Sequence, residues 1–224
     1  MDIQSRFELL PFVEVPAEEQ LEKSRQFYEL LKKRRSVRHF SNRPVADIVI
    51  QNIIATAATA PSGANKQPWR FVVITDSELK KNIRVAAEKV EKINYERRFP
   101  QQWLDDLKPL GTSFSKPFLE DAPVLIIVFK IDYEVNEDGG KSKNYYVNES
   151  VGIATGMLIA AIHNAGLVTV THTPSPMKFL QDICKRSSNE KPFMLLPVGY
   201  PAEDVIVPKL SKKEMAEYLV VNPD

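Results

Sequence analysis

Residues 34–38 read Arg-Arg-Ser-Val-Arg, and residues 61–71 read Pro-Ser-Gly-Ala-Asn-Lys-Gln-Pro-Trp-Arg-Phe. The first segment gathers three guanidinium groups and a hydroxyl, which together offer many hydrogen-bond donors to a phosphate. In the second segment Gly63 and Ala64 have almost no side chain, so a flat ring can approach the main chain. The two segments predict a site for a phosphorylated planar cofactor. The alternative interpretation is a solvated basic stretch followed by an ordinary loop.

The two segments resemble the flavin-binding signature of the nitroreductase superfamily, and the resemblance runs from about Tyr28 to the C-terminus. It implies an α+β fold in which a central mixed or antiparallel sheet is flanked by helices. It also implies a domain-swapped homodimer with FMN at the subunit interface. We therefore expect one FMN-binding domain over residues 1–224, with an N-terminal extension at 1–16 and an active-site lid at about 92–119.

Length and composition fit this expectation. The chain has 224 residues, 43% of them hydrophobic, which suits a globular domain with an ordinary core. Its net charge of +1 argues against a nucleic-acid partner. A single cysteine, Cys184, excludes an internal disulfide and fits a reducing compartment. The charged N-terminus and the lack of a long apolar run predict a cytoplasmic protein without a membrane segment.

The spacing of hydrophobic residues, together with capping residues, prolines and glycines, predicts the helices and strands. We expect strands at 71–74, 122–129, 168–171 and 193–201. We expect helices at 17–33, 44–60, 77–98, 145–165 and 175–185. Pro44 would open the second helix after a Ser41 or Asn42 cap, Asp76 would cap the third, and Gly166 would end the fourth. Residues 132–143 are predicted to be a charged loop.

Two segments have distinctive compositions. Residues 99–119 mix prolines with apolar and aromatic side chains, which suits a lid or an irregular surface excursion. The helix predicted at 145–165 is apolar nearly all round, and Gly152 and Gly156 would let another helix pack closely against it. The family resemblance implies that this helix lies at the dimer core.

No side-chain machinery for catalysis is recognisable. The three histidines have no spacing typical of metal ligands, so we expect no metal site. The chain also lacks a serine nucleophile elbow and the glycine patterns of the Walker and Rossmann motifs. A cofactor that carries the reactivity is therefore the economical interpretation.

The resemblance assigns residues to the flavin. It implies that Arg34, Arg35, Ser36 and Arg38 bind the phosphate and ribityl chain, and that Pro61, Ser62, Gly63 and Ala64 line the ring from the partner subunit. It places Thr171, His172 and Thr173 at the ring edge, with Thr173 ahead of Thr171 as the donor to flavin N5. Lys212 matches a final phosphate-binding position where many relatives have arginine, so the bidentate fork is lost there.

Within the superfamily, residues 91–95, 103–107, 165–171 and 195–201 resemble the iodotyrosine deiodinases. The resemblance implies that Glu91, Tyr95 and Lys116 grip the zwitterion of a halotyrosine. Glu91 and Tyr95 are four residues apart and share one helix face, where both can accept from an ammonium. Lys116 can pair with the carboxylate. The alternative interpretation is a helix-surface charge and a loop cation.

The implied reaction is reductive dehalogenation of 3-iodo- and 3,5-diiodotyrosine, and of bromo- or chlorotyrosine, to tyrosine and halide. The resemblance gives catalytic roles to Thr173 and to the backbone N–H of Ala64, which would bind the phenolate oxygen. An external reductant, NAD(P)H or a reductase, would supply electrons. The alternatives are a general NAD(P)H-dependent nitro or quinone reductase, a flavin-fragmenting synthase, and a flavin-binding module without catalysis.

Overall fold

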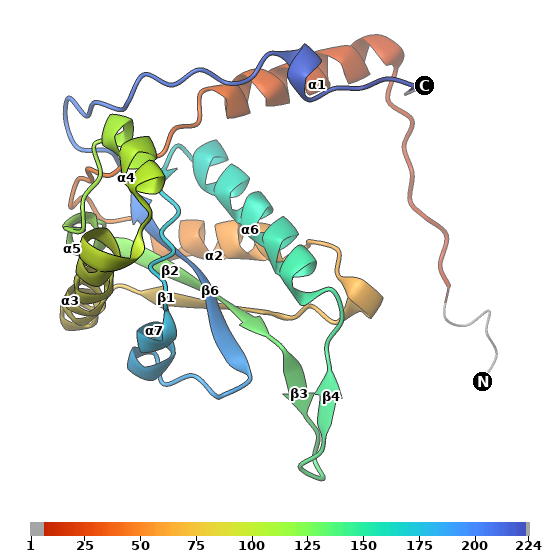
Figure 1. Cartoon of the computed structure of the whole chain (residues 1–224). Coiled ribbons are helices and arrows are strands. Elements are labelled where there is room, and N and C mark those ends of the chain that lie inside the picture. Colours follow the sequence, from red (N-terminus) through yellow and green to blue (C-terminus); the bar gives the residue numbers. More distant parts are fainter. Residues whose placement is uncertain (1–6, 223–224) are drawn as a thin grey trace. The chain divides into compact units, whose positions relative to one another are not determined.

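A computed structural model describes residues 7–222, and the chain divides into two units, Met1–Arg34 and Arg35–Asp224 (Figure 1). In the first unit, residues 7–16, which belong to the predicted N-terminal extension, have no regular structure. Residues 1–6 of that extension lie outside the described residues. Helix α1 (Ala17–Lys32) follows, with Glu18 and Glu19 in its first turn and Lys32 in its last. These charges complement the helix dipole.

The second unit is built on an antiparallel sheet. Its strands are β1 (Trp69–Ile74), β2 (Val124–Ile131), β5 (Val168–Thr169) and β6 (Glu190–Gly199), in the spatial order β1-β2-β6-β5. All three pairings are antiparallel, and an isolated parallel bridge joins Ser36 to Thr169 at the β5 edge. In β2 every residue except Lys130 is buried, so the strand predicted at 122–129 is covered on both faces and runs from Val124 to Ile131.

Helices cover both faces of this sheet. Helices α2 (Asp47–Ala58) and α6 (Val147–Asn164) pack on the face that carries Ile126, Val128 and Leu196. Helices α3 (Ser77–Ile93), α5 (Phe118–Asp121) and α7 (Lys178–Ile183) cover the face that carries Leu125, Ile127 and Leu195. The alternation of strand side chains therefore produces two hydrophobic cores, one on each side of the sheet. This confirms the predicted α+β class.

Several caps are where the sequence predicts them. Asp76 Oδ1 accepts a hydrogen bond from the Leu79 backbone N–H at 2.8 Å and opens α3. Gly166 follows α6 with φ +75°, the left-handed conformation that glycine adopts without strain. Helix α3 continues into a π-helical turn, Asn94–Arg98. The segment predicted to be a lid, at about 92–119, contains this turn, helix α4 (Gln101–Leu107) and a 3₁₀ turn, Lys108–Leu110, and is called the lid below.

Other expectations were wrong in detail. Helix α2 begins at Asp47 and not near Pro44, because the Ser41 hydroxyl accepts from the Arg43 N–H in a local turn before the helix. Residues 132–143 form a hairpin of β3 (Tyr133–Val135) and β4 (Lys141–Lys143), not a loop. Its turn is closed by the Asn136 N–H, which donates to the Gly140 carbonyl, and Gly139 has φ +80°.

The remaining shifts are at element ends. The regular part of β5 stops at Thr169, two residues before the predicted end, and α7 begins at Lys178, three residues later than predicted. Among residues 7–222, no helix is long and apolar enough to cross a membrane.

Candidate active site

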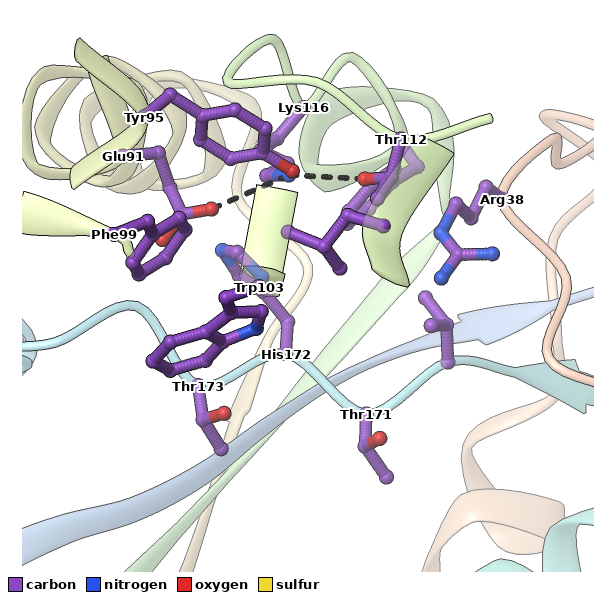
Figure 2. Close-up of a pocket in the computed structure, with 13 residues that line it drawn as sticks. Arg38, Glu91, Tyr95, Phe99, Trp103, Thr112, Lys116, Thr171, His172 and Thr173 are labelled. Atoms are coloured by element: carbon purple, nitrogen blue, oxygen red, sulfur yellow. Dashed lines mark hydrogen bonds and ion pairs between the residues drawn. The ribbon is translucent and has the colours of Figure 1, made fainter. Parts of the chain in front are cut away.

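The end of α3, the lid and the segment after β5 enclose a cavity of about 160 Å³ (Figure 2). It brings together seven of the residues singled out from the sequence: Arg38, Glu91, Tyr95, Lys116, Thr171, His172 and Thr173. Phe99, Trp103, Leu107, Thr112, Phe118 and Val170 complete the lining. The cavity is smaller than the roughly 300–1,000 Å³ of a typical ligand pocket.

A buried ion pair joins α3 to the lid. Lys116 Nζ lies 3.3 Å from Glu91 Oε2, and the two side chains are only 4% and 9% exposed. Burial lowers the pKa of Lys116 from its ordinary value, although the Glu91 charge opposes this shift. The lysine also donates to Thr112 Oγ1 at 3.2 Å and to the Ser113 carbonyl. Glu91 and Lys116, which were predicted to bind the two charges of a ligand and are called the clamp below, are thus paired with each other in this structure.

The backbone of Lys116 is fixed as firmly as its side chain. Its N–H donates to Glu88 Oε1 at 2.6 Å, and Glu88 is paired in turn with Arg84 at 2.9 Å. Both partners lie on α3, the helix that carries Glu91. The position of Lys116 along the lid is therefore defined by that helix.

Tyr95 and two further aromatic side chains form the roof of the cavity. The Tyr95 hydroxyl is hydrogen bonded to Thr112, and Lys116 Nζ lies 5.5 Å from the Tyr95 ring centre (Figure 2). Burial, reinforced by the Glu91 charge, raises the pKa of Tyr95, so the phenol stays neutral. The ring centres of Tyr95 and Phe99 are 5.3 Å apart. Trp103 stacks on Phe99, with ring centres 4.3 Å apart. Sequence reasoning missed Phe99, although the spacing of four residues signals the stack.

Arg38 is a half-buried cation on the cavity wall. No hydrogen-bond or ion-pair partner of its side chain is found among residues 7–222. Burial lowers the pKa of the guanidinium, which nevertheless remains charged. A partly desolvated positive charge without a counter-ion is costly unless an anion binds it. Arg38 therefore fits the predicted contact with a phosphorylated cofactor.

The neighbouring residues of the basic segment have separate positions. Arg35 donates to the carbonyl of Pro208, which attaches the C-terminal segment to this region. Ser36 forms the bridge to Thr169. Arg34 is the last residue of the first unit. Lys212 is exposed in the irregular C-terminal segment and does not line the cavity.

The loop at residues 61–67 lies apart from the cavity, beside the start of α6. The Gly63 N–H faces Ser150 Oγ at 3.4 Å. A Cβ on Gly63 would lie 3.0 Å from the Tyr146 ring and 3.1 Å from the Tyr145 carbonyl, so only glycine fits without a shift. Ala64 is exposed with φ +49°.

The side chains of residues 171–173, which follow β5, point to two different sides. Thr171 and Thr173 point one way, and His172 points the other way, toward Glu91 and Lys116 (Figure 2). His172 is 8% exposed and packs edge-on against Phe118, with ring centres 5.8 Å apart. Burial, Lys116 and Arg38 together lower the pKa of His172 to about 3, so its ring is neutral.

Two further observations concern metal binding and the reactivity of the single cysteine. Within residues 7–222, no cluster of three or more His, Cys, Asp or Glu side chains could hold a metal ion. Cys184 ends α7, and burial raises the pKa of its thiol to about 11. Such a thiol is a poor nucleophile at neutral pH.

The Nitroreductase family model matches residues 31–200, and the chain belongs to this family of flavoproteins. Among its curated relatives are enzymes named iodotyrosine deiodinase. That of Haliscomenobacter hydrossis is 58% identical over 91% of this chain and 92% of the relative. That of Nematostella vectensis is 49% identical over 94% and 80%. Iodotyrosine deiodinase 1 of Homo sapiens is 47% identical over 92% and 71%.

A solved structure of an iodotyrosine deiodinase is also similar to this chain. The crystal structure of oxidized iodotyrosine deiodinase bound to FMN and 3-iodo-L-tyrosine is 33% identical. It covers 88% of this chain and 99% of that chain, with a TM-score of 0.75. A putative NAD(P)H nitroreductase from Parabacteroides distasonis, 20% identical with a TM-score of 0.62, covers 88% and 98% and shares the fold. The predicted fold and family are therefore confirmed.

The neutral state of His172 predicts a pH dependence of stability. The folded protein keeps the ring unprotonated down to about pH 3, whereas the unfolded chain takes up a proton near pH 6.5. Stability is therefore lost as the pH falls below 6.5. When the pH is lowered from 7.5 to 5, the unfolding free energy of the wild type should fall by about 2 kcal/mol more than that of His172→Gln. Denaturant melts at both pH values measure this difference, and a pH-independent difference would contradict it.

Proposed function

We propose that this protein is an FMN-dependent enzyme that reductively dehalogenates halotyrosines such as 3-iodotyrosine and 3,5-diiodotyrosine. The observation that carries the proposal is the buried Glu91–Lys116 pair beneath Tyr95 and the aromatic lid. It offers one charge of each sign beside an apolar roof, which matches an aromatic amino-acid zwitterion. Relatives named iodotyrosine deiodinase, up to 58% identical to the chain, support the same substrate class.

The proposed recognition of the substrate replaces the Glu91–Lys116 ion pair by two ion pairs with the ligand. The ligand's ammonium takes the place of Lys116 at Glu91, and the ligand's carboxylate takes the place of Glu91 at Lys116. Each new contact is a charge-assisted hydrogen bond in a site with little water, where electrostatic attraction is strong. Phe99 and Trp103 cover the ligand and exclude solvent. Tyrosine shares the zwitterion, so preference for the halogenated ring has to come from the ring end of the site.

The residues fit FMN as the cofactor. Arg35, Ser36 and Arg38 would hold its phosphate and ribityl chain, joined by Arg34 and, from the C-terminal segment, by Lys212. The uncompensated charge of Arg38 supports this assignment. Thr171 and Thr173 would meet the edge of the ring, with Thr173 donating to N5. Pro61, Ser62, Gly63 and Ala64 of a second subunit would lie against the ring. FMN, once reduced, supplies the electrons that expel the halide.

The chain's own groups then handle the substrate's oxygen. Ala64 has an exposed backbone in the left-handed conformation, and we assign its N–H to the phenolate oxygen of the substrate. Holding that oxygen places the halogen-bearing carbon for protonation. In the overall reaction two electrons and one proton replace the carbon–halogen bond by a carbon–hydrogen bond, and halide leaves.

Electron supply and location complete the proposal. We propose that NAD(P)H, directly or through a reductase, reduces the flavin, and that the enzyme works in the cytoplasm. Anaerobic mixing with NADPH, followed by flavin absorbance, separates direct from assisted reduction. Bleaching within the turnover time would show that no separate reductase is required.

The proposed homodimer rests on α6. Gly152 and Gly156 are exposed, and a Cβ built on either would meet no atom within 4 Å. Ile153, between them, is 47% exposed. An apolar helix with an uncovered face of small residues suits close packing against a second copy. The loop at residues 61–67 would then reach the partner's flavin.

Substitution of Gly156 tests the dimer. Gly156→Leu fits the single chain, but it should separate the subunits and lower FMN content at least tenfold, because the partner's loop no longer covers the ring. Light scattering and flavin absorbance measure both effects. Lys81→Leu, which adds a leucine to the exposed surface of α3, is the matched control. A dimeric Gly156→Leu protein with full FMN content would contradict the assignment.

Halide release tests the reaction. Holoprotein reduced with dithionite under anaerobic conditions should release iodide from 3-iodotyrosine and leave tyrosine. Glu91→Gln should lower kcat/KM about a hundredfold, because a buried charge-assisted contact is lost. Glu96→Gln, on the exposed side of the following turn, should change it less than twofold. Rapid turnover of nitroaromatics without iodide release would favour a general nitroreductase instead.

Thr173 is tested separately. Thr173→Ala should bind 3-iodotyrosine with nearly native affinity but release iodide at least tenfold more slowly, because only its flavin contact is removed. Flavin fluorescence measures binding, and ion chromatography measures iodide. Native iodide release by Thr173→Ala would remove this residue from the mechanism and leave Thr171 as the candidate.

A further inference from the structure

His172 has a buried ring nitrogen that nothing in the proposed function uses. Its Nε2 is inaccessible to solvent and has no hydrogen-bond partner in the described part of the chain. Asn144, Thr169 and Glu190 also have such an atom, but of these four residues only His172 lines the lid cavity. An unsatisfied buried polar atom is costly, so one beside a binding site calls for a partner that arrives during function.

The position of the ring is determined by its surroundings. The His172 N–H donates to the Leu195 carbonyl at 2.9 Å, and the Leu195 N–H donates to the His172 carbonyl at 3.0 Å. This bridge to β6 fixes the backbone, and strand alternation turns the ring away from Thr171 and Thr173. Phe118 packs edge-on against it. The ring therefore faces the Glu91–Lys116 pair and not the side on which the flavin was assigned (Figure 2).

The charges around the ring favour a hydrogen-bond acceptor. Lys116 comes from the lid and Arg38 from the segment before α2, and both act on the imidazole. Glu91 and Tyr95 line the same cavity from α3 and the turn after it. Because burial, together with these two cations, opposes a proton on the ring, the imidazole is neutral and can offer a lone pair to a neighbouring ammonium group.

The ion pair creates the need for such an acceptor. When a ligand's ammonium group takes over Glu91, Lys116 loses part of its buried counter-charge. The ligand's carboxylate restores it only if Lys116 keeps its direction. Thr112 and Ser113, its other acceptors, belong to the same segment of the chain as Lys116. His172 comes from the sheet side, so it would add an acceptor that does not depend on the conformation of that segment.

We propose that His172 is a positioning residue for Lys116: its Nε2 accepts a hydrogen bond from the lysine ammonium once the ligand's own ammonium occupies Glu91. The inference rests on the proposed binding of halotyrosines. It assigns His172 to recognition of the amino-acid end of the substrate and not to the flavin. The orphaned nitrogen then has its partner in the complex.

A double-mutant cycle with FMN-loaded protein tests this role. The dissociation constant of 3-iodotyrosine is measured from flavin fluorescence in the wild type, His172→Leu, Lys116→Met and the double variant. His172→Leu should weaken binding about tenfold when Lys116 is present, as expected for one hydrogen bond to a charged group. In the Lys116→Met background the same change should have an effect below twofold. Equal weakening in both backgrounds would overturn the proposal.

Further variants separate positioning from structure. His172→Gln places an amide oxygen near the Nε2 position and should restore affinity to within about threefold. Thr169→Val removes another orphaned buried atom outside the cavity and should leave the dissociation constant unchanged. If His172→Leu does not retain FMN, the cycle is run with His172→Phe. Loss of affinity in His172→Gln as large as in His172→Leu would contradict a hydrogen-bonding role.

The two levels of the proposal fail in different ways. If the wild type does not bind 3-iodotyrosine, the proposed function and the role of His172 are both wrong. If the wild type binds it and the cycle is additive, the proposed function stands and only the role of His172 is wrong.

Discussion

The Glu91–Lys116 ion pair is the interaction on which the site depends. Removing two charges from water costs several kcal/mol each, and the cost is recovered only with close geometry and further hydrogen bonds. The 3.3 Å separation, together with Thr112 and Ser113, provides both. The pair joins Lys116 to α3. Tyr95 is separately hydrogen bonded to Thr112. A zwitterion is one of the few ligands that can separate these charges without leaving either unpaired.

The sheet supplies the fixed side of the site. The segment after β5 is bonded to β6 through the His172–Leu195 bridge, so its side chains alternate between two functional directions. Two hydroxyls point to the side that we assign to the flavin, and one imidazole points to the clamp (Figure 2). Arg38, the last residue of the basic segment at 34–38, is a half-buried and uncompensated cation on the cavity wall.

Much of this was predictable where a local rule dominates. The buried strand β2, the Asp76 cap and the Gly166 end of α6 follow from side-chain pattern and backbone preference. The hairpin at 133–143 was not predictable, because its strands are only three residues long and lack buried residues. The resemblance to the family identified Glu91, Tyr95 and Lys116 from the sequence. The sequence could not show that Glu91 and Lys116 pair with each other, or that His172 faces away from Thr173, because these two features depend on tertiary packing.

The central claim is that charge exchange at this ion pair, and not the aromatic ring alone, provides affinity. The most direct measurement compares 3-iodotyrosine with 2-iodophenol, which has the same halogenated ring without the zwitterion, in titrations of the FMN-loaded wild type followed by flavin fluorescence. The account predicts that 3-iodotyrosine binds at least about a hundredfold more tightly, as expected for two charge-assisted contacts. Equal dissociation constants for the two ligands would contradict it.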